Sequence, residues 1–292
     1  MRVLVTGASG FIGSYVVRVL GRIEGLEVVA TGRSEEALRS LGCAWFAADL
    51  TSENMGAGAA QHGPFDLLIH LAWGDVADTD NPIHTDRHLS DHSRLLLALT
   101  ESWVARISCV GTCFEYGLQG GCISEEAAPR PITTYGRAKN QLRQRLEAEL
   151  GSSSASLTWL RPFFTYGLGQ APHALFAQLD RAIDTGDATF PMSGGEQVRD
   201  YLPVQELAEA IVKASLQNEV TGTINICSGV PQTVRSLVEA HIARRGSAIQ
   251  PELGLFPYPV HTPMRFWGDT KKLNAALAAF DRSFKIGAEL RP

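Results

Sequence analysis

The sequence predicts an α/β protein with a doubly wound parallel sheet and a second, smaller lobe. Short apolar segments alternate with helical segments in units of roughly thirty residues as far as Pro162, the rhythm of a sheet with helices on both faces. A glycine-rich turn follows the first apolar segment. After Pro162 the rhythm breaks down, which indicates that the chain leaves the sheet to build another lobe.

The elements can be placed in order along the chain. Strands are expected in the apolar or β-branched runs 3–5, 27–31, 43–47, 65–71, 106–110, 157–161 and 223–227. Helices are expected at 11–20, 34–41, 86–104, 135–150, 172–185, 204–216, 233–244 and 270–279, and loops at 56–63, 111–131 and 251–263. The sheet domain is then 1–161 plus about 204–227, and the second lobe is about 162–203 and 228–292.

Composition excludes several classes of partner. The net charge of −5 offers no general basic field, so nucleic acid is not an expected partner. No apolar run reaches the roughly 18 residues needed to span a bilayer, and the first strand leaves no room for a signal peptide. Five cysteines without a C-x-x-C pair suit reduced thiols, so a cytoplasmic protein is expected.

The first strand and the turn after it predict a dinucleotide site. Gly7, Gly10 and Gly13 lie between the buried strand 3–5 and an apolar helix, the context that this motif requires. Glycine allows a positive φ and a close approach of the backbone to a ligand. The free N–H groups at the start of the helix, with Phe11 and Ile12, suit a pyrophosphate.

A tyrosine and a lysine open the helix after the long loop. Tyr135 and Lys139 stand at i and i+4, so they share one helical face. A phenol has a reference pKa near 10, and a neighbouring ammonium favours its ionised form, which brings the tyrosine toward the range useful in proton transfer. The pattern is common by itself, and its position downstream of the glycine turn gives it weight.

Together these motifs resemble the extended short-chain dehydrogenase/reductases of the nucleotide-sugar epimerase/dehydratase type, which carry a Rossmann-type sheet. The matching segments are TGASGFIG (6–13), HLAW (70–73), GTCFEYG (111–117), YGRAK (135–139), RPFFTYG (161–167), GGEQVRDYLPVQELAEAI (194–211), INICSG (224–229) and MRFWGDTKKL (264–273). The resemblance implies a catalytic triad of Thr112, Tyr135 and Lys139.

Departures from the family pattern narrow the reaction. The family's 4,6-dehydratases follow this Thr with an Asp-Glu acid–base pair, whereas Cys113 and Phe114 stand here, so a dehydratase is not expected. Phe164 replaces an Asn that helps to hold the substrate diphosphate, so this contact is assigned to Arg199, with Arg265 as a second candidate. Cys113 and Phe114 are expected to border the substrate.

The end of the second strand indicates the cofactor. NAD enzymes tend to carry an acid there for the ribose 2′-OH, whereas Arg33 and two neighbouring hydroxyl groups favour the 2′-phosphate of NADP(H), with NAD as the alternative. The resemblance also places Asp49 and Leu50 beside the adenine and Leu71 and Ala72 beside the ribose. It adds Tyr135, Lys139 and Arg161 to the cofactor site.

His84, His88 and His92 share one helix side at i, i+4 and i+8, a spacing that could hold a metal. Their neighbours are charged, so we expect a solvated face and no metal site.

The sequence therefore predicts an NADP(H)-dependent nucleotide-diphospho-sugar 4-ketoreductase acting on a 4-keto-6-deoxyhexose. An NAD-dependent C4 epimerase is the first alternative, and a non-catalytic cofactor-sensing protein is the second. The resemblance also suggests a homodimer through helices 86–104 and 135–150.

Overall fold

The main body of the protein is a seven-stranded parallel sheet, seen in a computed structural model that describes residues 1–52, 54–151 and 155–287. The last residues of the expected second lobe, 288–292, lie outside this range. The strand order is β12-β7-β5-β4-β1-β2-β3. The strands are β1 (Arg2–Thr6), β2 (Glu27–Gly32), β3 (Ala44–Ala47), β4 (Leu67–His70), β5 (Arg106–Val110), β7 (Ser156–Pro162) and β12 (Gly222–Ile226).

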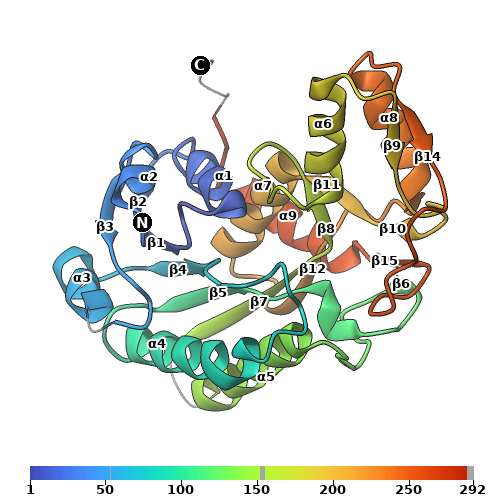
Figure 1. The fold of residues 1–292 in the computed structure, drawn as a ribbon. Helices are drawn as coiled ribbons and strands as arrows, with labels where there is room; N and C mark the ends of the chain where they lie inside the picture. The colour runs from blue at the N-terminus through green and yellow to red at the C-terminus, as the bar shows by residue number, and fades with distance from the viewer. Residues whose placement is uncertain (53, 152–154, 288–292) are drawn as a thin grey trace.

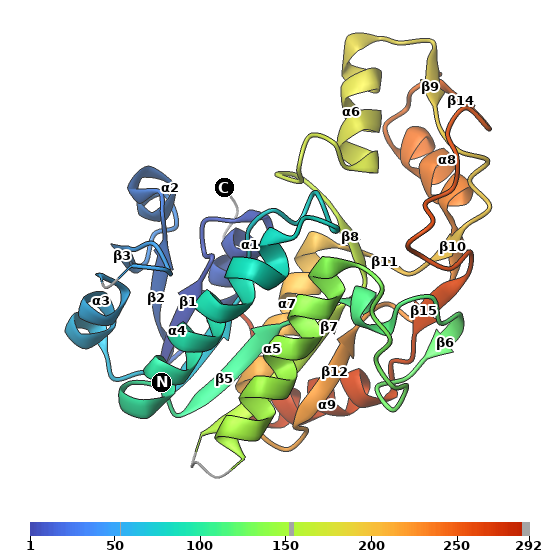
Figure 2. The same cartoon turned by 60° about the horizontal axis from the view of Figure 1, so that its bottom comes forward.

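Helices cover both faces of the sheet (Figure 1, Figure 2). One face packs against α1 (Phe11–Leu20), α2 (Glu35–Arg39), α7 (Val204–Leu216) and α9 (Lys271–Ser283). The other packs against α3 (Asn54–His62), α4 (Leu89–Ser102) and α5 (Thr134–Leu150). The doubly wound Rossmann-type fold predicted from the sequence is therefore confirmed. No helix in the described ranges is both long and apolar enough to cross a membrane.

The segment expected to be a loop at 56–63 is instead helix α3. Its small residues let the helix approach the sheet closely: a Cβ on Gly58 would lie 2.4 Å from the Phe46 ring. Met55 and Ala59 are buried on the same side. The loop was predicted at 56–63 because glycine has a low helix propensity. Packing against Phe46 overrides that propensity.

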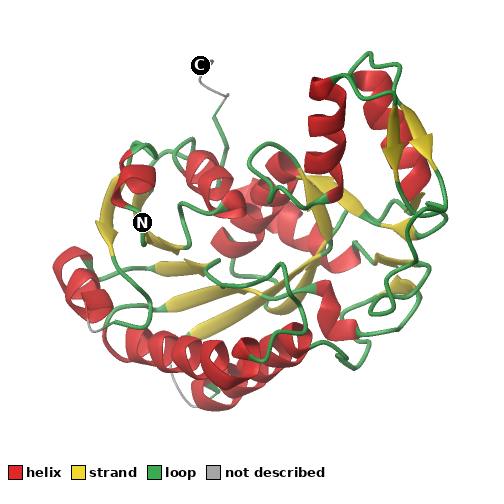
Figure 3. Ribbon diagram, viewed as in Figure 1, coloured by secondary structure: helices red, strands yellow, loops and turns green. Residues whose placement is uncertain are grey.

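A second cluster of elements stands apart from the sheet and has its own core (Figure 3). It contains α6 (Leu175–Thr185), β9 (Thr189–Pro191), α8 (Val234–Arg244) and β14 (Gln250–Glu252). Phe176, Leu179, Phe190, Val238 and Ile242 are among its buried residues. The sequence division gave helix 270–279 to this lobe, but the observed α9 packs against α7 and β12, so we place it with the sheet.

Short two-stranded pairings join the lobe to the sheet. β8 (Phe164–Tyr166) pairs with β11 (Tyr201–Pro203), β10 (Val198–Arg199) with β13 (Gln232–Thr233), and β6 (Gly121–Ile123) with β15 (Phe266–Gly268). Asp200 is buried at this junction and accepts hydrogen bonds from the backbone N–H groups of Ser228 (2.7 Å), Gly229 (2.8 Å) and Gly268 (3.3 Å). One carboxylate therefore ties together three segments that are distant in sequence.

Candidate active site

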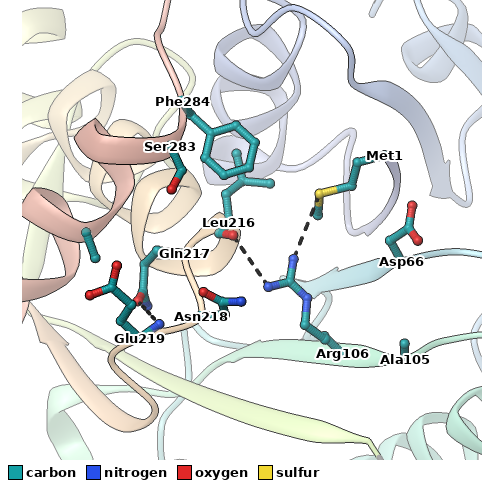
Figure 4. A pocket seen from close by; sticks show the side chains of 11 residues that line it. Met1, Asp66, Ala105, Arg106, Leu216, Gln217, Asn218, Glu219, Ser283 and Phe284 are labelled. Carbon is teal, nitrogen blue, oxygen red and sulfur yellow. Dashed lines mark hydrogen bonds between the residues drawn. The ribbon is translucent and has the colours of Figure 1, made fainter.

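The predicted site residues gather around a cavity of about 860 Å³ at the carboxyl ends of the strands. Loops after β1, β2, β3, β4, β5 and β7 line it, together with residues 170–174 that lead into α6. Ligands of doubly wound sheets bind at this edge. A second cavity, of about 700 Å³, lies at the opposite edge, where Arg106 donates weakly to the Leu216 carbonyl oxygen at 3.4 Å (Figure 4). It contains none of the predicted site residues.

The glycine turn lines the cavity and tolerates no side chain. Gly7 has φ +68°, and a Cβ there would lie 2.7 Å from the Ala72 nitrogen. A Cβ on Gly13 would lie 2.1 Å from the Gly7 oxygen. Gly10 caps α1, whose first turn carries no acidic residue. The start of this helix therefore lines the cavity with no acidic side chain in its first turn, and its free N–H groups and positive dipole end fit a dinucleotide pyrophosphate.

Thr112, Tyr135 and Lys139 line the same cavity. Thr112 begins the 3₁₀-helix η2 (Cys113–Tyr116) and its hydroxyl accepts from the Phe114 N–H at 3.2 Å. Tyr135 and Lys139 stand in the first turns of α5, and the Lys139 ammonium donates to the Val110 carbonyl oxygen at 2.7 Å. The fold thus brings together one hydroxyl, one phenol and one ammonium from two elements.

Burial shifts the pKa values of Tyr135 and Lys139. Burial, followed by the negative charge of Glu115, raises the pKa of Tyr135, so its phenol holds a proton at neutral pH. Burial lowers the pKa of Lys139 to about 8, against the opposing influence of Cys109 and Glu115. Lys139 is therefore still mostly charged at pH 7. The site contains a protonated phenol beside a cation.

A buried carboxylate lies beneath the Thr112 loop. Glu115 accepts hydrogen bonds from the Thr112 N–H (2.9 Å), the Trp159 indole N–H (2.9 Å) and the Arg161 guanidinium (2.8 Å). Arg161 was assigned to the cofactor, but its guanidinium is buried against Glu115 and the Tyr116 ring, and it is absent from the cavity lining. The tertiary packing therefore gives Arg161 a supporting role below the site.

The part of the cavity next to Tyr135 is rich in aromatic carbon. Phe114 lies 6.4 Å from the Tyr135 ring and 6.3 Å from the Phe164 ring, between centroids. Tyr201 stacks on Phe164 at 5.2 Å. Burial raises the pKa of the Cys113 thiol to about 12, so it stays protonated and serves as a small apolar group.

The two arginines assigned to the substrate do not line this cavity. Arg199 is buried and donates to the Thr262 hydroxyl at 2.9 Å and the Met264 carbonyl oxygen at 3.2 Å. Its guanidinium also lies 5.6 Å from the Phe164 ring, which does line the cavity. Arg265, which follows Met264 directly in the chain, is exposed. Arg199 is therefore separated from the cavity by one aromatic ring and stays a proposal as a diphosphate ligand.

Arg33 stands exposed at the far end of the cavity, close to Asp49 and Leu50. The two hydroxyl groups expected beside Arg33, those of Thr31 and Ser34, are not available to a ligand. Thr31 is fully buried, and the Ser34 hydroxyl accepts from the Ala37 N–H as the cap of α2. Arg87, which the sequence reasoning overlooked, lines the same end, and both arginines help to lower the pKa of Asp49 after its hydrogen bonds to Thr51.

The three histidines at 84, 88 and 92 were expected on a solvated face, and this prediction is wrong. A π-helical turn, η1 (His84–His88), precedes α4 and directs the histidine side chains inward. His84 and His92 are buried, and all three rings lie within 6.4 Å of the Trp73 ring, between centroids. The charged neighbours Asp86 and Arg87 are exposed, and the prediction extended their exposure to the histidines. Among the described residues, no group of three potential ligands could hold a metal ion.

Sequence reasoning also missed Trp73 and Thr79. Trp73 follows Leu71 and Ala72 directly and extends the cofactor-side loop after β4. Thr79 lies farther along the same loop, and its carbonyl oxygen accepts from the Tyr135 N–H at 2.9 Å. The bulky Trp73 in a run of small residues was a usable signal. No sequence signal could have indicated the contact of Thr79 with α5, because that contact depends on tertiary structure.

The model of the NAD dependent epimerase/dehydratase family matches residues 3–227. The chain belongs to this family. It is accordingly an NAD(P)-dependent oxidoreductase of the extended short-chain dehydrogenase/reductase type, which removes the non-catalytic alternative.

Individual relatives agree with this assignment. The chain is 30% identical over 274 residues to a dTDP-6-deoxy-L-talose 4-dehydrogenase (NAD(+)) of Aggregatibacter actinomycetemcomitans, covering 92% of this chain and 99% of that one. It is 26% identical to a dTDP-6-deoxy-L-talose 4-dehydrogenase (NAD(P)(+)) of Kitasatospora kifunensis, covering 84% and 79%. A UDP-glucuronic acid 4-epimerase of Bacillus cereus, solved with UDP-glucuronic acid and NAD, shares the fold at TM-score 0.82 and 21% identity, covering 96% and 93%.

Proposed function

We propose that this enzyme is an NADP(H)-dependent 4-dehydrogenase of a nucleotide-diphospho-sugar, working as a 4-ketoreductase on a 4-keto-6-deoxyhexose. The observation that carries the proposal is the cavity itself. Thr112, Tyr135 and Lys139 line it together with the glycine turn, while Cys113 and Phe114 stand where a dehydratase needs its two carboxyl groups. Two relatives named as 6-deoxytalose 4-dehydrogenases support the same reaction class.

The cavity residues fit a dinucleotide, and each would have a defined task. The N–H groups at the start of α1 would bind the pyrophosphate, Arg33 the 2′-phosphate, and Lys139 the nicotinamide ribose. A bound nicotinamide cofactor would supply or accept hydride at C4 of the sugar. In the reducing direction Tyr135 donates its proton to the C4 oxygen, and Thr112 donates a hydrogen bond to the same oxygen.

The protonation states favour reduction. Because burial and Glu115 raise the pKa of Tyr135, its phenol is ready to donate a proton at neutral pH. The Lys139 ammonium then stabilises the phenolate that remains. Oxidation of the alcohol needs that phenolate beforehand, so it should be favoured at higher pH.

The aromatic wall supports a 6-deoxy sugar. Phe114 and Phe164 present carbon next to Tyr135, where a C6 methyl group gains from burial. A C6 hydroxyl against the same rings would lose its hydrogen bonds to water without replacement. Arg199, behind Phe164, is the group we propose for the substrate diphosphate. Binding there requires the guanidinium to exchange its bonds to Thr262 and Met264 for phosphate oxygens.

The test is a substrate panel. Purified enzyme with NADPH or NADH is offered 4-keto-6-deoxyhexoses carried on dTDP, GDP and UDP, and the fall in absorbance at the nicotinamide band is followed. We expect turnover of at least one 4-keto-6-deoxy sugar, faster with NADPH, and loss of turnover in Tyr135→Phe. No oxidation of either coenzyme by any of these sugars would refute the proposal.

A C4 epimerase is the second candidate, because the chain shares the fold of a UDP-glucuronic acid 4-epimerase at TM-score 0.82. An epimerase regenerates its cofactor and consumes none in net terms. Denaturing the purified enzyme and measuring the released nucleotide separates the two. Stoichiometric bound NAD, with interconversion of two 4-hydroxy sugars and no net use of NADPH, would favour the epimerase.

A further inference from the structure

The loop after β4 places an indole ring against the lysine of the triad. The Lys139 Nζ atom lies 4.0 Å from the centroid of the Trp73 ring, a distance typical of a cation–π contact. The same ammonium donates one hydrogen bond, to the Val110 carbonyl oxygen. Lys139 is nearly fully buried, so the attraction to the ring is little weakened by water.

Trp73 is itself held on two sides. Its indole N–H donates to His84 Nδ1 at 3.1 Å, and His84 Nε2 lies 2.9 Å from the Asp78 carbonyl oxygen. The His92 ring stacks on the indole with centroids 4.4 Å apart and planes 19° apart. Because His84 and His92 are buried and packed, the indole has little freedom to rotate.

The stacking histidine is anchored to the sheet. His92 Nδ1 lies 2.9 Å from His70 Nε2, and His70 Nδ1 lies 2.8 Å from the Thr6 hydroxyl. Burial lowers the pKa of His70 to about 3 and that of His92 well below its usual value, so both rings are neutral. A hydrogen-bonded path thus runs from β1 through β4 to His92 on α4, and the His92 ring stacks on the indole that touches Lys139.

The charge of Lys139 is not balanced by a direct ion pair within the described part of the chain. The titratable groups that face it from its own helix and from the elements packed against it are Tyr135 on α5, His70 on β4, His92 on α4, Cys109 on β5 and Glu115 on η2. Of these, only Glu115 is a carboxylate, and it is bound to Arg161. The indole face, 4.0 Å from Nζ, and the Val110 carbonyl oxygen are therefore direct contacts that stabilise the ammonium.

We propose that Trp73 is a positioning residue of the reaction, which keeps Lys139 charged and in place beside Tyr135 through its ring face, and that His92 holds the ring in that position. This inference rests on the proposed role of Lys139 in hydride transfer. It assigns a function to the aromatic and histidine cluster that the triad leaves unexplained. Trp73 acts through Lys139 and not on the substrate.

Lysine titration by nuclear magnetic resonance tests the inference without any substrate. The chain has five lysines, at 139, 213, 271, 272 and 285, so ¹³C-lysine gives few signals, and Lys139→Arg identifies the one of interest. In Trp73→Leu the pKa of Lys139 should fall by ~0.5 to 1.5 units, because the charged form loses its ring partner. Trp45→Leu is the matched control, since that ring lies over Arg39 and away from the cavity.

A second perturbation leaves the packing intact. Replacing all five tryptophans biosynthetically with a multiply fluorinated analogue weakens the attraction of the ring face for a cation while nearly preserving its shape. The pKa of Lys139 should fall here too, by less than in Trp73→Leu. Trp73→Phe, which keeps a ring face, should restore most of the shift.

Kinetics supply the functional readout. The upper pH limb of kcat for reduction should move to lower pH in Trp73→Leu, in step with Lys139, while KM for the sugar changes little. An unchanged Lys139 titration in both Trp73→Leu and the fluorinated protein would overturn the inference, whatever the substrate proves to be. A shifted titration in a protein that reduces none of the 4-keto sugars would support it while refuting the proposed function.

Discussion

Glu115 and Arg161 form an ion pair, 2.8 Å from Oε2 to Nε, that is almost completely buried beneath the loop carrying Thr112. The other oxygen of the same carboxylate accepts from the Thr112 N–H. A Cβ on Gly111 would lie 2.3 Å from that oxygen, so the loop can approach the carboxylate only with glycine at this position. The pair therefore links the stability of the sheet to the position of a proposed catalytic hydroxyl.

Neutralising this pair should be costly. In Glu115→Gln the buried Arg161 charge loses its partner, and we expect the free energy of unfolding to fall by roughly 3–5 kcal/mol. Urea denaturation followed by circular dichroism measures it. Glu239→Gln is the matched control, because it breaks an exposed ion pair with Arg235 and should cost less than about 1 kcal/mol. Equal losses in the two variants would contradict the assigned burial effect.

Tyr135→Phe should abolish most of the turnover without removing the cofactor site. The ring and its packing against Phe114 and His84 are retained, while the proton donor is lost. We expect kcat to fall by about 10² to 10⁴-fold. The dissociation constant of NADPH, measured by fluorescence titration, should change by less than about threefold if the phenol acts mainly in proton transfer. A variant that retained wild-type kcat would exclude Tyr135 as the proton donor.

The glycine turn should tolerate no methyl group. In Gly13→Ala the new Cβ would lie 2.1 Å from the Gly7 oxygen, so the turn must move and the N–H groups at the start of α1 lose their alignment. Dinucleotide binding measured by calorimetry should weaken by at least about tenfold, or 1.4 kcal/mol. Gly56→Ala in α3 meets no atom within 4 Å and should bind normally, with up to about 1 kcal/mol of added stability.

Arg33 should control coenzyme preference. Its charge-assisted bonds to a 2′-phosphate are worth about 1.5–3 kcal/mol, so Arg33→Ala should raise KM for NADPH by roughly tenfold to a hundredfold and leave KM for NADH nearly unchanged. Arg39→Ala, on the exposed face of α2 and paired with Glu35, is the control and should alter neither. If Arg33→Ala raised both values equally, the 2′-phosphate assignment would be wrong and NAD would be favoured.

The fold should become less stable in mild acid because of His70. Burial lowers its pKa to about 3, below the unfolded value near 6.5, so the unfolded chain binds more protons between these values. The contribution is complete above pH 6.5 and is lost as the pH falls toward 3, on the order of 5 kcal/mol in total. Unfolding free energies at pH 7, 6 and 5 should fall steeply in the wild type and less so in His70→Asn. Equal slopes in the wild type and in His70→Asn would contradict the assignment to His70.

Local sequence determined much of the architecture, because its signals need no distant partner. Three apolar residues before a glycine turn define β1 and the start of α1, and Val204–Leu216 and Arg106–Val110 have the bounds that their periodicity indicates. The spacing of Tyr135 and Lys139 fixes their shared helical face whatever surrounds them. The family and the cofactor class follow from these same segments.

Only the tertiary structure decided which side chains meet. Arg161 lies in a favourable motif, yet a carboxylate 46 positions earlier draws it away from the cavity. The histidines at 84, 88 and 92 have charged neighbours in sequence, but a π-helical turn and the Trp73 ring direct them inward. Burial and pairing are properties of contacts between distant segments. The sequence therefore determined the sheet and the proposed proton donor, Tyr135. Packing between distant segments determined that the Trp73 ring lies against Lys139 beside it.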